Sequence, residues 1–119
     1  MVVTTVIFYT KNNARSPVAD DIRDMNNDDK AKVLACLKSV EELGLDSPRV
    51  VFRQIKGKLW EIKIRTKDNS YRIFYIVINK NTFVLLHIYK KQSQKAPAKE
   101  LKLAEKRMME VLKNETNYT

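Results

Sequence analysis

The sequence predicts an α+β fold in the order β-α-α-β-β-β-α, with an antiparallel sheet of about four strands. Three observations support this prediction. An N-terminal stretch rich in β-branched residues precedes two stretches with helical spacing of apolar residues. Three β-rich stretches separated by short turns follow, and an amphipathic stretch comes last. At 119 residues, we expect one domain spanning residues 1–113 and a frayed C-terminal tail at 114–119.

The N-terminal third predicts one strand and a helical hairpin. Residues 2–9 are rich in valine, isoleucine and aromatics, so they predict a strand. Ser16 and Pro17 are typical of a helix start. Asn27-Asp28-Asp29 predicts the cap of a longer second helix that ends at Gly44. The acidic residues here could bind a metal, but helix caps and solvated faces explain them better.

The middle of the chain predicts an antiparallel meander after a connector at residues 45–52, which we expect to be extended only towards its end. Leu59–Arg65 alternates apolar and charged residues, and this pattern places Glu61, Lys63 and Arg65 on one face. Residues 71–78 are apolar almost throughout, as in a central strand buried on both faces. Residues 82–90 predict the next strand, and Pro97 opens the last helix.

Positive charge is concentrated in this meander. Residues 53–95 contain eleven Lys and Arg against two Asp and Glu, so this segment alone matches the +9 net charge of the whole chain. A basic sheet between nearly neutral flanks is typical of a surface that binds a polyanion.

Other features of the sequence argue against a membrane protein, a disulfide-bonded protein and a protein that binds a metal or a cofactor. No window approaches the ~18 apolar residues that a membrane span needs. The single cysteine, Cys36, excludes an internal disulfide and favours a reducing cytoplasm, and we interpret it as a packed thiol. The chain has no metal-binding or nucleotide-binding motif, so we expect neither a metal nor a cofactor.

Arg65 and Arg72 are the first candidates for chemistry. They flank a short turn between two predicted antiparallel strands, so they should be near-neighbours at one end of the sheet. In one interpretation Arg72 pairs with Glu61 and only holds the sheet together. In the other, both guanidiniums converge on a phosphate, which their planar fork binds bidentately.

Several lysines and two tyrosines should reach the same sheet face or its rim. Lysine runs are usually solvated surface, but several runs on one sheet with interleaved aromatics favour nucleic acid. We interpret His87 as a structural residue rather than a catalyst. The candidate contacts are Lys56, Lys58, Tyr71, Tyr89, Lys90, Lys91 and Lys95.

Four segments carry a family resemblance. KGKLWEIKIR (56–65), YRIFYIV (71–77), LLHIYKKQSQKAP (85–97) and KELKLAEKR (99–107) together resemble the HigB branch of the RelE-like toxins, over roughly residues 50–108. These proteins are the toxin halves of bacterial type II toxin–antitoxin pairs, many with phage-derived relatives. The resemblance implies a RelE-like, microbial-RNase-like fold.

The resemblance also implies an activity. The family cleaves mRNA, generally on the ribosome and without a metal, by attack of the 2′-OH on the adjacent phosphate. It implies catalytic roles for Arg65, Arg72, Lys90 and Lys91, and for Glu61 either a catalytic role or the orientation of an arginine. Contacts to RNA are implied or expected for a second set: Lys56, Lys58, Lys63, Tyr89 and Lys95.

The general base stays open. Arginine does not deprotonate at neutral pH, and Pro97 and its neighbours occupy the stretch where RelE has a tyrosine. The resemblance implies a helix-turn-helix antitoxin that holds the toxin in a heteromeric complex. Two other hypotheses remain open, namely an RNA-binding domain without cleavage activity and a diverged toxin that keeps only its protein partner.

Overall fold

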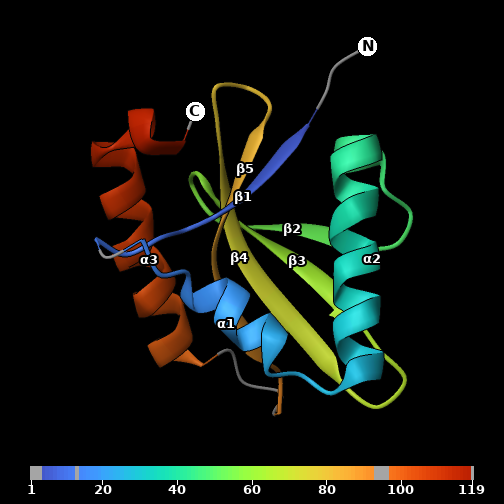
Figure 1. The fold of residues 1–119 in the computed structure, drawn as a ribbon. Coiled ribbons are helices and arrows are strands. Elements are labelled where there is room, and N and C mark those ends of the chain that lie inside the picture. Colours follow the sequence, from blue (N-terminus) through green and yellow to red (C-terminus); the bar gives the residue numbers. More distant parts are fainter. Residues whose placement is uncertain (1–3, 13, 93–96, 119) are drawn as a thin grey trace.

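The computed structural model describes residues 4–12, 14–92 and 97–118, and it confirms the α+β class with three helices and one sheet (Figure 1). Lys95 and the first two residues of the expected N-terminal strand lie outside the described residues. The elements are β1 (Thr5–Phe8), α1 (Pro17–Arg23), α2 (Asn27–Leu43), η1 (Gly44–Asp46), β2 (Val51–Lys56), β3 (Leu59–Arg65), β4 (Ser70–Ile78), β5 (Thr82–Lys90), α3 (Ala98–Lys113) and η2 (Glu115–Tyr118).

The sheet has five strands rather than about four, in the order β1-β5-β4-β3-β2. The four strands from β2 to β5 form the antiparallel part, whereas β1 runs parallel to β5. The prediction missed β2, which begins inside the expected connector. As a half-exposed edge strand, β2 has no continuous apolar run. Its signal was the turn at Gly57, which adopts a φ of 55° that favours glycine.

Helices cover both faces of the sheet. α1 and α2 lie on one face, where Val18, Ile22, Val33 and Val40 join a core with Ile62 and Ile64 of β3. α3 lies on the other face, where Ala104 and Val111 pack on residues of β4 and β5 (Figure 1).

The helix starts follow the expected capping chemistry. The Ser16 hydroxyl accepts a hydrogen bond from the Ala19 N–H at 3.2 Å. The cap of α2 is Asn26, one residue before the expected cap, and its side chain accepts from the Asp29 N–H at 2.8 Å. Gly44 ends α2 with a φ of 58°.

The C-terminal tail is not frayed, and that expectation was wrong for the described part of the tail. Residues 115–118 form η2, and Tyr118 is buried. Its hydroxyl lies 3.2 Å from the carbonyl oxygen of Thr10, to which it donates, and 3.3 Å from the Thr10 N–H, from which it accepts. The large buried ring holds the chain end against the residues that follow β1.

Candidate functional site

One part of the α3-side face carries a row of polar side chains. In register across the sheet, Lys63 of β3 pairs with Arg72 of β4, which pairs with Tyr89 of β5. One row along, Arg53 of β2 pairs with Glu61 of β3. Because residues paired directly across strands point to the same side of a sheet, these five side chains leave one face, which we call the open face.

A buried carboxylate lies between two guanidiniums on the open face. Glu61 is only 2% exposed. Its Oε1 atom lies 3.7 Å from Nε of Arg72 and 3.5 Å from Nη2 of Arg53. Both distances exceed a normal hydrogen bond, and no atom of the described residues forms a hydrogen bond with Oε1. The pairing of Arg72 with Glu61, one of the two expected alternatives, is therefore present.

Further contacts fix the guanidinium of Arg72. Its Nη1 donates to the Ser70 hydroxyl at 2.7 Å and to the Tyr71 carbonyl oxygen at 3.4 Å. Its side chain is 12% exposed, whereas that of Arg53 is 53% exposed. Arg72 is thus held in place, with a small part of its side chain accessible.

Arg72 also lines a groove of about 580 Å³ that we call the basic groove. Its lining residues are Lys32, Pro48, Arg49, Val50, Val51, Lys63, Ile64, Arg65, Ser70 and Arg72. Five of them are cationic and none is a carboxylate. The structure thus brings Arg65 and Arg72 into one groove, as near-neighbours across the turn, and Lys63 lies there with them. It adds Lys32 and Arg49, which sequence reasoning missed because they lie far apart in the chain and outside any motif.

Three of the lysines that we expected at the same sheet face or its rim do not line the basic groove. Lys90 pairs in register with Tyr71, which packs on the side of α1 and α2, and it lines a separate cavity with Asp21 and Asp24. Lys56 forms an ion pair of 3.7 Å with Glu105 of α3. Lys58 lines the same small cavity as Lys56, away from the basic groove.

Lys91 lies close to the groove along the backbone. Its N–H donates to the Ser70 carbonyl oxygen at 2.8 Å, and Ser70 lines the basic groove. Lys95 lies outside the described residues, so its place relative to the groove is not described.

Tyr89 belongs to an aromatic stack on the open face. Its ring stacks on Phe74 at 5.7 Å and on His87 at 6.1 Å between centroids. Burial, and then the negative charge of Glu61, raise the pKa of Tyr89, so its hydroxyl stays protonated at neutral pH.

His87 takes part in a buried network, in agreement with its interpretation as a structural residue. Nδ1 lies 3.3 Å from Nη1 of Arg107, and Nε2 lies 3.1 Å from Oε1 of Glu100. Because arginine only donates, Nδ1 accepts and the hydrogen resides on Nε2, which donates to Glu100. Arg107 also donates to the Leu86 carbonyl oxygen at 3.0 Å, so the network joins α3 to β5.

The turn between β3 and β4 is anchored to the start of α2. The buried Asp29 carboxylate accepts from the Tyr71 hydroxyl at 2.6 Å and from the Asn69 amide at 2.7 Å. These hydrogen bonds, above all the one from Tyr71, lower the pKa of Asp29. Asp29, which the sequence suggested as a cap residue, therefore also fixes the turn that separates Arg65 from Arg72.

Comparison with known proteins identifies a family. The model of the family described as "Phage derived protein Gp49-like (DUF891)" matches residues 20–109, which include the whole basic groove. No curated protein matches the chain. None of the helices in the described part of the chain is long and apolar enough to cross a membrane. The matching family is associated with RelE-like and HigB-like toxins of type II toxin–antitoxin systems, and this association implies an antitoxin partner. The chain belongs to the phage-derived Gp49-like family.

Proposed function

We propose that this protein is the toxin of a type II toxin–antitoxin pair and that it cleaves mRNA on the ribosome without a metal. The observation that carries the proposal is the basic groove, where Lys63, Arg65 and Arg72 converge beside the buried Glu61. Two guanidiniums and an amine, with Arg72 held by its contacts to Ser70 and Tyr71, match the charge of a phosphate that is under attack. Membership of a toxin-like family supports the same conclusion.

The proposed reaction is a transesterification within the RNA. The 2′-oxygen forms a bond to the adjacent phosphorus and loses its proton, while the bond from phosphorus to the 5′-oxygen breaks. The 5′-oxygen takes up a proton, so the products are a 2′,3′-cyclic phosphate and a free 5′-hydroxyl. Negative charge grows on the non-bridging oxygens, and Arg65 and Arg72 would stabilise it there.

Glu61 is better placed to hold Arg72 than to contact RNA. Its Oε1 atom is almost inaccessible to solvent, so a 2′-hydroxyl could not reach it without rearrangement of the face. Two lysines remain for the proton transfers. Lys63 is the cross-strand neighbour of Arg72, and Lys91 follows β5 beside Ser70. We assign the proton transfers to these two amines and a positioning role to Glu61.

The first experiment is induced expression of the wild-type chain beside its Arg72→Lys form, with primer extension on a translated reporter mRNA. Arg72→Lys keeps the charge beside Glu61 and removes the planar fork, so it should fold and lose most activity. We expect the wild type to arrest growth and produce discrete cuts. Lys106→Gln, on α3 and outside the groove, is the control and should behave as wild type.

An RNA-binding domain without cleavage activity is the second candidate, because the same groove would bind phosphates in either case. If the wild type leaves growth and mRNA intact while the purified protein binds RNA, the cleavage proposal falls and this candidate stands. The proposed partner is a helix-turn-helix antitoxin encoded beside the toxin. Co-expression with the product of such a neighbouring reading frame should abolish growth arrest and yield a heteromeric complex.

A further inference from the structure

The basic groove continues past the open face. Lys63 and Arg72 belong to the open face, whereas Val50 and Ile64 belong to the core beneath α1 and α2. Lys32 comes from α2 itself. A single hollow lined by residues of both faces must turn around the end of the sheet, from β4 across β3 and the start of β2 to α2. The cations at its two ends therefore lie on opposite sides of the sheet.

The far end of the groove is a built structure. The connector before β2 is tied to α2 by a 2.6 Å hydrogen bond between the buried hydroxyls of Ser39 and Ser47. The buried thiol of Cys36 donates a weak hydrogen bond to the Arg49 carbonyl oxygen at 3.8 Å. These contacts fix the backbone that carries Arg49 next to Lys32.

The charges at this end are not neutralised. Within the described residues, no ion pair joins Lys32, Arg49, Lys63 or Arg65 to a carboxylate, and no carboxylate lines the groove. Like charges gathered in one hollow repel each other, so their clustering favours a bound anion. Arg72 differs from the other four cations, because it faces Glu61.

We propose that Lys32 and Arg49 form a second phosphate-binding subsite, for a phosphate of single-stranded RNA that flanks the one bound at Arg72. The inference rests on the proposed function, because both phosphates belong to the same strand. The RNA would leave the open face, pass the end of β3 and turn towards α2.

Single-stranded RNA fits this groove better than an acidic protein segment. Arg72 lines the same hollow as Lys32 and Arg49, so one polyanion can occupy both ends. Val51, directly opposite Lys63 in register, is 59% exposed and lines the same groove. An exposed apolar side chain between cations suits RNA, because the faces of its bases are apolar and its backbone is anionic.

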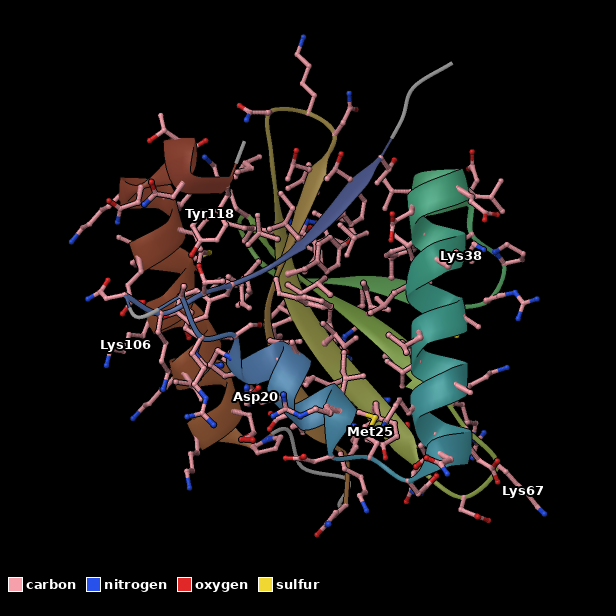
Figure 2. The ribbon with its side chains drawn as sticks, viewed as in Figure 1. Asp20, Met25, Lys38, Lys67, Lys106 and Tyr118 are labelled. Carbon is pink, nitrogen blue, oxygen red and sulfur yellow. The ribbon has the colours of Figure 1, made fainter. Side chains whose placement is uncertain are left out.

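The test measures binding of a fluorescent 2′-O-methyl oligouridine, which cannot be cleaved by the proposed chemistry. The variant is Lys32→Gln/Arg49→Gln. The control is Lys38→Gln/Lys106→Gln, which removes the same charge from exposed positions of α2 and α3 outside the groove (Figure 2). All four residues are exposed, and thermal unfolding should confirm that both variants fold.

We expect the groove variant to lose roughly tenfold in affinity and the control to lose less than about twofold. The slope of log K against log salt should fall by about 0.7 in the groove variant, as for a protein that neutralises one phosphate fewer on a single strand. If the two variants bind equally, the subsite is refuted.

A second probe and the wild type separate the remaining outcomes. If an oligoglutamate peptide binds the wild type and not the groove variant, while RNA affinity is unaffected, the groove serves an acidic protein segment and the RNA proposal is overturned. If the wild type never cleaves RNA but the binding results are as expected, the proposed catalysis fails and the subsite stands.

Discussion

Arg72 and Arg53 face the same carboxylate, yet replacing each by alanine should change stability very differently. Arg72 lies 3.7 Å from Oε1 of Glu61 and is 12% exposed, whereas Arg53 lies 3.5 Å away and is 53% exposed. The distances alone would give the two arginines equal weight. The difference in solvent exposure decides the outcome, because water screens the interaction of the exposed side chain.

The magnitude follows from Coulomb's law and the loss of a buried partner. At an effective dielectric constant of about 20, two charges at 3.7 Å attract by roughly 4 kcal/mol. Without Arg72, Glu61 stays buried beside the screened Arg53 alone, and breaking a buried pair in this way costs about 3 kcal/mol. For Arg53→Ala we expect less than about 1 kcal/mol. In a domain of this size, about 3 kcal/mol lowers Tm by roughly 10 °C.

The assay is urea unfolding of the two alanine variants, each with and without Glu61→Gln. Neutralising Glu61 should recover most of the loss in Arg72→Ala, because the stranded charge is gone, and should recover little in Arg53→Ala. If Arg72→Ala is no less stable than Arg53→Ala, or if Glu61→Gln gives no recovery, the buried pair does not hold the open face. The assignment of Glu61 as a positioning residue would then be wrong.

Three further measurements test other parts of the structure, and a fourth tests the packing of the cysteine. The hydrogen bond from Tyr71 lowers the pKa of Asp29, so the stability that this bond contributes is present above about pH 4 and is lost as pH falls through the lowered pKa. The urea midpoints of the wild type and Tyr71→Phe should therefore differ at neutral pH and converge in acid. A difference that stays constant with pH would contradict this. Burial raises the pKa of Tyr9 and Tyr71 to about 12, so wild-type stability should fall as pH rises from about 10 towards 12, and tyrosinate absorbance that titrates near 10 for both would refute it. Tyr118→Ala should lower the free energy of unfolding by about 2–3 kcal/mol, measured by thermal unfolding, because a buried ring is lost. Unchanged stability would instead support the expectation that the tail is frayed. The buried Cys36 thiol, whose pKa burial raises, should react with a thiol reagent only in denaturant, and fast labelling of the native protein would contradict its packing.

Local patterns were enough to predict most of the fold. The alternation in Leu59–Arg65 predicted which side chains of β3 share a face, and the cap residues placed the starts of α1 and α2 to within a residue. The sequence pattern did not predict β2, because an edge strand is half exposed and needs no continuous apolar run. The tail was misjudged because Tyr118 is buried by contacts with Thr10, more than a hundred positions earlier in the chain.

The candidate site was predictable only in part, for a similar reason. Arg65 and Arg72 flank one turn, so their proximity follows from the hairpin itself. Lys32 and Arg49 join them through tertiary packing of α2 and the connector, which no spacing in the sequence encodes. Lys90 was expected at the same sheet face as the arginines or at its rim, whereas the alternation of side chains along β5 puts it on the opposite face from its neighbour Tyr89.

The parallel pairing of β1 with β5 has a consequence for how the chain folds. Thr5 pairs with Thr82, so β1 is synthesised well before β5, the strand with which it pairs. All the residues that line the basic groove lie between Lys32 and Arg72, so the groove can form before that partner exists. Until β1 docks, β5 is a largely apolar strand with an unpaired edge, which is a template for pairing with other chains. The N-terminal strand therefore covers an edge that would otherwise favour aggregation, and its pairing with β5 is a long-range contact that the chain can make only after β5 exists.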